Sequence, residues 1–339
     1  MHIFENISLK NYNTFGIDAK TRYFTKFSCE KEIPALLNHI NSLKLSYMIL
    51  SGGSNILFTQ DFPGLTLHVN LKGITKLSES GDFVLVKAMA GEDWEDLVKY
   101  CLKNNWGGIE NLTLIPGKVG TSPMQNIGAY GVELKDVFHE LEALKVNTGE
   151  IHTFNKSDCR FGYRNSFFKQ EGKGRFIILS VTFKLTQKNH FINSGYGAIM
   201  HELERRKIDK PGIHDIADVV RFIRTSKLPD PEVLGNAGSF FKNPVIPAKQ
   251  HEKLKKRFSE IVAYPDRSGN MKIAAGWLIE NAGWKGYRVG DAGVHKLQAL
   301  VLVNHGKASG MEILQLSENI RKSVKDRFQI NLEPEVNIL

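Results

Sequence analysis

The sequence predicts a mixed α+β protein with two or three lobes. Its 339 residues are too many for one simple hydrophobic core. Segments with helical spacing of apolar residues alternate with short apolar segments typical of strands, without the regular rhythm of a β–α–β sheet. A proline-rich break at residues 225–231 indicates a domain boundary before the last third of the chain.

The N-terminal two thirds of the chain contain most of the predicted strands. Residues 29–43 are expected to form a helix, because their apolar side chains recur at helical spacing. A second helix is expected at residues 94–104, preceded by Glu92 and Asp93, which favour the positive end of a helix dipole. Strands are expected at residues 47–50, 83–90, 138–146, 149–154 and 176–185.

The C-terminal part is predicted to be richer in helix. A strand is expected at residues 300–304, and the tail at residues 330–339 alternates apolar and polar side chains, so that it can add a strand to an earlier sheet. Helices are expected at residues 215–224, 249–258, 274–281 and 311–328.

Composition argues against several classes of protein. Hydrophobic residues make up 42% of the chain and charged residues 24%, an ordinary globular balance. No apolar run approaches the roughly 20 residues of a membrane span, and no signal peptide is recognisable, so a cytoplasmic protein is expected. The cysteines, Cys29, Cys101 and Cys159, lack zinc spacing, so reduced thiols and no metal site are expected.

The net charge of +9 is compatible with nucleic acid, an acidic membrane or small anionic ligands. The basic residues are scattered, and no arginine-rich arm or known nucleic-acid module is present. We therefore expect diphosphate-bearing ligands, and neither a nucleic acid nor a membrane as a partner.

Two glycine-rich segments indicate where such a ligand binds. Residues 115–131 contain four glycines and two prolines, and residues 51–55 read Ser-Gly-Gly-Ser-Asn between two apolar runs. Glycine lets the backbone approach a flat polyanion closely, and successive backbone N–H groups can form a nest around a pyrophosphate. Residues 51–55 alone are as compatible with a plain turn, but the two segments together favour one large phosphate-bearing cofactor.

The usual nucleotide motifs are absent. No G-x-G-x-x-G follows a strand, so a Rossmann site is disfavoured, and no G-x-x-x-x-G-K-[ST] motif occurs. The cofactor is therefore expected to be held in another way, with the side chains of Gln125 and Asn126 able to bond the heteroatoms of a ring.

Five motifs in order carry a resemblance to a known family. The chain resembles the UDP-N-acetylenolpyruvoylglucosamine reductases, FAD enzymes of peptidoglycan synthesis, from residue 13 to its C-terminus. The motifs are Gly-Gly-Ser-Asn at residues 52–55, the segment 115–131, Cys-Arg-Phe-Gly-Tyr-Arg at 159–164, Gly-Asn-Ala-Gly-Ser-Phe-Phe-Lys-Asn-Pro at 235–244 and Leu-Glu-Pro-Glu-Val at 332–336. The sequence Ser-Gly-Tyr-Gly at 194–197 is similar to the subtype (type I) that closes a tyrosine loop over the substrate.

The resemblance implies a two-lobed FAD-binding region of the vanillyl-alcohol-oxidase (PCMH) type and a C-terminal α+β substrate domain. The two lobes are expected at residues 1–80 and 81–226. The substrate domain is expected at 227–328, and residues 329–339 form a tail that carries Glu335 back to the active site. A monomer is expected.

The reaction implied by the resemblance reduces UDP-N-acetylglucosamine enolpyruvate to UDP-N-acetylmuramate. The hydride comes from NADPH by way of non-covalently bound FAD, and a proton completes the product. Ser239 matches the family's proton donor, although a serine after glycine would otherwise be read as a turn or helix cap. Arg164 and Glu335 match a pair that polarises the substrate carboxylate, although each alone would be read as a surface charge.

Further matches assign residues to the cofactor and to the substrate. The expected cofactor-binding residues are Gly52, Gly53, Ser54, Asn55, Pro116, Gly117, Gly120, Thr121, Gln125, Asn126, Ile127 and Arg224. The expected substrate-binding residues are Tyr130, Tyr196, Lys227, Asn243, Lys285 and Gln298.

Three residues depart from the family's pattern. Lys118 stands where a smaller residue is usual in the cofactor loop, and Asn165 stands where aspartate is commoner. Asn337 replaces a usual arginine after the last motif, which puts a role for that arginine in doubt.

Two alternatives remain open from the residues. One is a flavin oxidase of the same superfold acting on another sugar or alcohol, which would need a base where Ser239 offers a proton donor. The other is a nucleotide-sugar binding protein without catalysis, against which the presence of Arg164, Ser239 and Glu335 argues.

Overall fold

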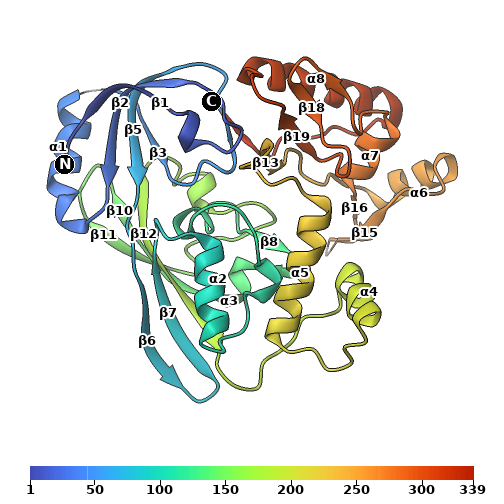
Figure 1. Cartoon of the computed structure of the whole chain (residues 1–339), viewed down its shortest axis with the longest axis horizontal. Helices are drawn as coiled ribbons and strands as arrows, with labels where there is room; N and C mark the ends of the chain where they lie inside the picture. Colours follow the sequence, from blue (N-terminus) through green and yellow to red (C-terminus); the bar gives the residue numbers. More distant parts are fainter. Residues whose placement is uncertain (44, 267) are drawn as a thin grey trace. The chain divides into compact units, whose positions relative to one another are not determined.

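The computed structural model describes residues 1–43, 45–266 and 268–339. The chain divides into two compact units, and both draw on separate stretches of sequence. Unit 1 contains residues 1–7, 21–53 and 62–226, and unit 2 contains residues 8–20, 54–61 and 227–339. The elements of both units are labelled in Figure 1.

The first sheet of unit 1 has the strand order β1-β2-β5-β3. Strand β5 pairs in parallel with both β2 and β3, which requires a crossover, and helix α1 (Ile33–Leu43) lies between β2 and β3 in the chain. The strands are β1 (Phe4–Ser8), β2 (Lys20–Phe27), β3 (Tyr47–Leu50) and β5 (Phe62–Val69).

The second sheet of unit 1 is antiparallel, in the order β11-β10-β12-β7-β6. Its strands are β6 (Ile74–Ser80), β7 (Phe83–Met89), β10 (Phe138–Lys145), β11 (Ile151–Asn155) and β12 (Phe176–Thr186). Helix α2 (Trp94–Lys103) turns Trp94, Leu97, Val98 and Cys101 into the core. The lobe boundary expected at residues 80 and 81 therefore falls in the turn between two paired strands, β6 and β7.

One continuous hydrophobic core joins the two sheets of unit 1. It includes Phe27 and Leu65 from the first sheet, Val86 and Val181 from the second, and Trp94 from α2, all nearly or fully buried. Buried apolar side chains of both sheets therefore pack in one cluster that spans the expected boundary between residues 80 and 81.

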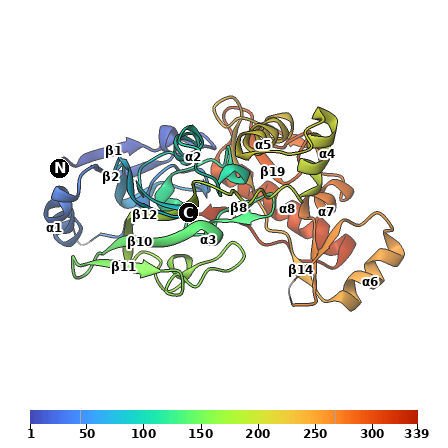
Figure 2. The same cartoon turned by 90° about the horizontal axis from the view of Figure 1, so that it is seen from below.

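Two helices at the end of unit 1 form a smaller core of their own. Helices α4 (Gly197–Arg206) and α5 (Ile213–Lys227) lie side by side in both views (Figure 1, Figure 2). Their contact is made by Ile199, Leu203, Ile216, Val219, Val220 and Ile223. The many charged residues of α4 hide its apolar spacing in the sequence. One of them, Glu202, is buried because Arg205 and Arg206 both donate to its carboxylate, at 2.6 and 2.7 Å. A short helix α3 (Leu134–Val137) and the strand pair β8 (Gly128–Ala129) and β9 (Val132–Glu133) complete unit 1.

Unit 2 is built around a sheet of order β13-β19-β18-β17. Its strands are β13 (Gly235–Ser239), β17 (Arg288–Val289), β18 (Ala292–Val294) and β19 (Val301–Asn304), and they pair antiparallel. Helices α7 (Ala275–Asn281) and α8 (Gly310–Phe328) belong with it, and α8 begins with a Ser309–Glu312 capping box. A smaller sheet contains β14 (Val245–Ile246), β15 (Ala263–Pro265) and β16 (Met271–Ile273). Helix α6 (Ala248–Arg257) lies between β14 and β15 in the chain.

The C-terminal tail adds a strand, as its alternating pattern predicted. Strand β20 (Asn337–Ile338) pairs in parallel with β4 (Ile56–Leu57) in unit 2. Most other predicted helices and strands are confirmed to within a few residues. The elements that had not been predicted are β1, β2, β4, β5, β6, β8, β9, the strands from β13 to β18, α3 and α4. Within the described ranges, no helix is long and apolar enough to cross a membrane.

Candidate functional site

The two glycine-rich segments lie against each other in unit 1. A Cβ atom added to Gly52 would lie 3.1 Å from Cα of Gly117 and 3.3 Å from Cγ of Lys118. A Cβ atom added to Gly120 would lie 2.5 Å from that of Ala90. A side chain at Gly52 would crowd the loop at Gly117, and a side chain at Gly120 would clash with Ala90 just after β7, so both glycines serve close approach of backbones. The structure thus brings together parts of both predicted cofactor segments.

Backbone hydrogen bonds fix the start of the second segment to the turn before α2. The N–H of Trp94 donates to the carbonyl of Gly117 at 3.0 Å, and the N–H of Val119 donates to that of Glu92 at 2.8 Å. Asp93 and Lys118 face each other in this short bridge.

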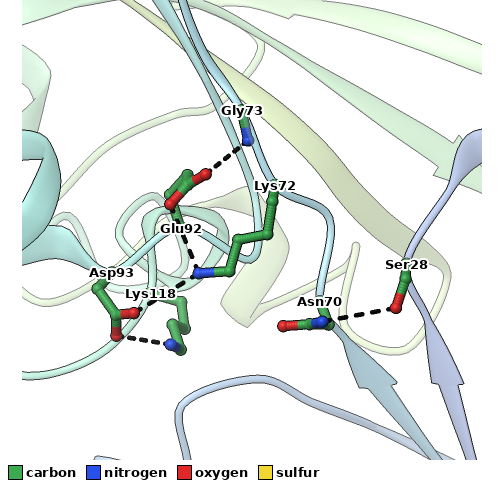
Figure 3. A network of polar contacts seen from close by, with 7 residues as sticks. All are labelled: Ser28, Asn70, Lys72, Gly73, Glu92, Asp93 and Lys118. Atoms are coloured by element: carbon green, nitrogen blue, oxygen red, sulfur yellow. Dashed lines mark hydrogen bonds and ion pairs between the residues drawn. The ribbon is translucent and has the colours of Figure 1, made fainter.

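Ion pairs strengthen the same junction (Figure 3). Nζ of Lys118 lies 2.6 Å from Oδ1 of Asp93. Nζ of Lys72 lies 3.5 Å from Oε2 of Glu92 and 3.6 Å from Oδ2 of Asp93. The other carboxylate oxygen of Glu92 accepts a hydrogen bond from the N–H of Gly73 at 2.5 Å. Lys118, at a position where the resemblance led us to expect a smaller residue, therefore has a defined partner in this chain.

The loop Ser51-Gly52-Gly53 has features suited to an anion. Gly53 has a left-handed backbone (φ 59°), a conformation used in anion-binding nests. Oγ of Ser51 is buried and has no hydrogen-bond partner among the described residues. A buried hydroxyl is costly without a partner, and a phosphate oxygen of a bound dinucleotide would satisfy it. The residues present therefore fit the diphosphate of FAD.

His68 adjoins this loop and is held neutral. Burial lowers the pKa of His68 to about 4, with the positive charges of Lys26, Lys118 and Lys72 adding to the effect and the backbone of Ser51 opposing it. Burial and these lysine charges together keep the imidazole uncharged at neutral pH.

Asn126 has a structural role in the second segment. Its side chain is fully buried, donates to the carbonyl of Gly162 at 3.1 Å and accepts from the N–H of Lys135 at 3.0 Å. Its backbone is left-handed (φ 46°). These bonds join the cofactor segment to the motif that contains Arg164, while a contact of Gln125, Asn126 or Ile127 with a cofactor stays a prediction.

Arg164, in the motif at residues 159–164, contacts the C-terminal end of the second glycine-rich segment. Its Nη2 donates to the carbonyl of Gly128 at 2.7 Å, and its guanidinium carbon lies 5.5 Å from the centre of the Tyr163 ring. Its backbone is left-handed (φ 52°), which is uncommon for a residue with a side chain and often marks functional sites.

Tyr130 and Tyr196, which were both predicted to bind the substrate, lie against each other. Their rings meet edge to face with centroids 5.3 Å apart. Burial raises the pKa of the Tyr130 phenol, whereas a hydrogen bond with the buried Arg224 opposes this effect. Arg224, predicted to bind the cofactor, therefore contacts a predicted substrate residue.

Asn111 holds the backbone beneath these tyrosines. Its buried Nδ2 donates to the carbonyl of Tyr130 at 3.1 Å and to that of Asn193 at 2.8 Å. Asn193 in turn donates to the carbonyl of Gly131 at 3.2 Å. The base of the tyrosine loop is thus joined to the end of the glycine-rich segment.

Ser239 and Glu335 are brought together in unit 2. The N–H of Glu335 donates to the carbonyl of Phe240 at 2.8 Å, and Phe241 and Pro334 form the next bridge. Phe240 and Phe241 are fully buried, whereas the side chain of Ser239 is exposed. The tail therefore places the predicted acid beside the strand that carries the predicted proton donor.

A β-bulge orients Ser239. The register of β13 against β19 shifts between Asn236 and Ser239, and Gly238 within the shift has a left-handed backbone (φ 68°). The N–H of Gly238 donates to Oδ1 of Asn236 at 2.9 Å. Bulges redirect side chains on edge strands and are frequent next to active sites.

The other predicted substrate residues of unit 2 lie near α7 or on the surface. Oδ1 of Asn243 accepts from the N–H of Ala275 at 2.9 Å, and a Cβ added to Gly276 would lie 3.2 Å from Oε1 of Gln298. Lys285 pairs with Glu280 at 2.7 Å, and Lys227 is exposed at the end of α5.

Sequence reasoning missed three residues that hold this site together: Asp93, Asn111 and Asn337. Each acts through a partner far along the chain, such as Asn55 for Asn337. In the sequence, Asp93 had been noted only for the helix dipole and Asn337 only as a departure from the expected motif.

Comparison with known proteins finds matches along nearly the whole chain. The model for an FAD binding domain matches residues 22–155, and the model for the C-terminal domain of UDP-N-acetylenolpyruvoylglucosamine reductase matches residues 230–339. A solved UDP-N-acetylenolpyruvylglucosamine reductase from Thermus caldophilus covers 100% of this chain and 99% of its own length, with a TM-score of 0.68 at 23% identity. The predicted fold class is thereby confirmed.

Curated relatives are much more similar in sequence. The UDP-N-acetylenolpyruvoylglucosamine reductase of Flavobacterium johnsoniae is 50% identical over 339 residues and covers 100% of both chains. That of Chromobacterium violaceum is 48% identical over 335 residues and covers 98% of both. The chain therefore belongs to the UDP-N-acetylenolpyruvoylglucosamine reductase family.

Proposed function

We propose that the protein is an FAD-dependent reductase that converts UDP-N-acetylglucosamine enolpyruvate to UDP-N-acetylmuramate, with NADPH as reductant, in peptidoglycan synthesis. The name of the Flavobacterium johnsoniae relative, which is 50% identical over the full chain, supports the reaction. The structural observation that supports the mechanism is the hydrogen bond from Glu335 to Phe240, which brings the predicted acid to the strand of Ser239.

The residues around Gly52 and Gly117 would hold the cofactor. Their close approach, the left-handed Gly53 and the buried hydroxyl of Ser51 suit a diphosphate. When bound, FAD supplies the hydride that adds to the outer carbon of the enolpyruvyl double bond.

The protein's own residues would manage charge and the proton. Adding hydride to the outer carbon leaves negative charge on the inner carbon, next to the carboxylate, and this charge must be stabilised where it develops. The guanidinium of Arg164 would bind the carboxylate, since its charge is permanent and its planar fork matches two oxygens. Oγ of Ser239, exposed at the bulge, would deliver its proton to the inner carbon, and Glu335 would polarise the developing enol.

The proposal extends to three further points. NADPH is expected as the source of reducing equivalents, because the product gains two electrons that must be replaced in each turnover. The protein is expected to act in the cytoplasm as a monomer. Tyr196 is expected to close over the bound nucleotide-sugar from its exposed position beside Tyr130.

The substitution Ser239→Ala tests the proposal by separating two half-reactions. We expect flavin bleaching by NADPH at close to the wild-type rate, and reoxidation by the enolpyruvyl substrate slowed by at least about 100-fold, as for loss of a positioned proton donor. Anaerobic stopped-flow absorbance measures both rates.

The exposed Ser259→Ala provides the control, because Ser259 lies on unit 2 outside the site. An equal loss of both half-reactions in Ser239→Ala would mean that Ser239 has only a structural role. Unchanged reoxidation would assign the proton to another group.

A further inference from the structure

The last residues of the chain run alongside residues 55–59 in unit 2. The N–H of Asn337 donates to the carbonyl of Asn55 at 3.1 Å, and the N–H of Leu339 donates to that of Leu57 at 2.9 Å. At the far end, the N–H and Oγ1 of Thr59 both donate to the carbonyl of Leu339, each at 2.6 Å. A parallel ladder this short is weak without support from side chains.

Two asparagine side chains reinforce the ladder at its start. Nδ2 of Asn337 donates to the carbonyl of Asn55 at 2.9 Å, so that this carbonyl accepts from both the backbone and the side chain of one residue. In return, Nδ2 of Asn55 donates to the carbonyl of Glu335 at 3.3 Å. The two asparagines therefore close a reciprocal pair of side-chain bonds around residues 335–337.

Glu335 is held from both sides as a result. Its N–H donates to Phe240, next to Ser239, and its carbonyl accepts from Asn55, a residue of the Gly-Gly-Ser-Asn motif. Removing the Asn337 amide would leave the carbonyl of Asn55 with only the backbone N–H of residue 337 as its donor in this contact. The Asn55 carbonyl would then lose one of the two bonds that Asn337 makes to it.

We propose that Asn337 is a positioning residue for Glu335. Its amide holds Asn55 so that the Asn55 side chain fixes the backbone of the acid, which links the glycine-rich motif to the catalytic tail. In this chain an uncharged clamp on the main chain thus stands where the family's pattern has a cation. The proposal rests on the proposed function for the role of Glu335, whereas the clamp itself can be measured independently.

The test compares Asn337→Ala with Asn337→Asp in the flavin-loaded, full-length protein. Aspartate keeps the shape of asparagine but cannot donate to the Asn55 carbonyl and repels it. We expect both variants to speed hydrogen exchange in the C-terminal peptide by about fivefold or more, as for loss of one neutral hydrogen bond. Reoxidation by the enolpyruvyl substrate should slow by a similar factor, whereas bleaching by NADPH should not change.

Two matched variants sharpen the test. Asn331→Ala removes an exposed asparagine from the same tail and should match wild type in every readout. Thr59→Val removes the hydroxyl bond to Leu339 at the other end of the ladder. It should speed exchange of the terminal peptide but leave reoxidation near the wild-type rate, since Asn337 and Asn55 are retained.

The outcomes distinguish the clamp from the proposed function. Wild-type exchange and reoxidation in Asn337→Ala would overturn the clamp. Faster exchange with unchanged reoxidation would show that the clamp exists but does not position a catalytic group, which also overturns the proposal. If the wild-type protein itself failed to transfer electrons to the enolpyruvyl substrate, the proposed function would fail while the exchange result still stood.

Discussion

At the scale of single residues, unusual backbone positions occur where chemistry is proposed. Arg164, Tyr130 and Asn126 have left-handed backbones although they carry side chains, and Gly238 has one beside Ser239. Such positions cost free energy and persist only when surrounding contacts enforce them. Here the enforcing contacts are hydrogen bonds to neighbouring backbone, such as that from Arg164 to Gly128.

Gly238→Ala tests the value of the bulge. A Cβ at this position would meet no atom within 4 Å, so only the left-handed backbone (φ 68°) opposes the substitution. We expect a loss of about 1–2 kcal/mol in the free energy of unfolding. A shift of the bulge would move Ser239, so reoxidation by substrate should fall more than flavin bleaching. Urea denaturation measures the free energy of unfolding, and stopped-flow absorbance measures the two rates. A wild-type rate of reoxidation together with the expected loss of stability would contradict the role of the bulge.

The pKa of the half-buried His68 predicts a pH dependence of stability. Its folded-state pKa is about 4, below the ordinary 6.5. Between these values the unfolded chain takes up a proton that the folded protein does not, so stability falls as pH falls from 6.5 towards 4 and is unaffected above. Allowing for screening by solvent, we expect a loss of about 1–2 kcal/mol. Urea denaturation of wild type and His68→Gln at pH 7 and pH 5 measures it; an equal pH dependence in both would contradict it.

At the scale of elements, the site depends on junctions between segments that are distant in sequence. The turn before α2 holds the loop at Gly117 through backbone bonds and through the Asp93–Lys118 ion pair. Asn111 joins the tyrosine loop to Tyr130 in the same manner. Loops that carry function must be positioned by rigid elements, and here polar side chains provide the connection.

A double-mutant cycle on Asp93 and Lys118 tests this junction. If the ion pair holds Gly117 near Gly52, Lys118→Met and Asp93→Asn should each weaken FAD binding by about two- to fivefold, the range of a partly exposed pair. The double variant should be no weaker than either single one. Flavin fluorescence in titrations of the apoprotein gives the dissociation constants.

The direction in which Asp93→Asn changes the dissociation constant of FAD shows whether Lys118 positions the loop or contacts the cofactor directly. If Lys118 bound the cofactor's phosphate itself, freeing it from Asp93 would leave binding unchanged or tighter. Lys76→Met serves as the control, because Lys76 pairs with Glu79 on the exposed strand β6, away from the glycine-rich loops.

At the scale of the whole molecule, sequence patterns predicted local structure better than its assembly. Amphipathic helices such as α2 and α8 were predicted because their apolar spacing is a property of neighbouring residues. Helix α4 was not predicted, because its stability depends on tertiary contacts. The carboxylate of Glu202 accepts hydrogen bonds from two arginines, and Ile199 packs against α5. The assignment of residues 8–20 and 54–61 to unit 2 depends on long-range contacts that no local pattern encodes.

The candidate site was predictable to a similar extent. The glycine-rich segments and the family's motifs identified the residues, and the tail's alternation predicted its added strand. The contacts of Asn337 with Asn55 and of Lys118 with Asp93 were not predictable, because each joins residues that lie far apart in the chain and no local pattern encodes such a pair.

The most direct test of the account is the visible absorption of the purified protein through one reaction cycle without oxygen. We predict a flavin band that NADPH bleaches and that the enolpyruvyl nucleotide-sugar restores, with one equivalent of UDP-N-acetylmuramate formed for each flavin reoxidised. A colourless protein that gains no flavin on addition of FAD, or a reduced flavin that only oxygen reoxidises, would contradict it.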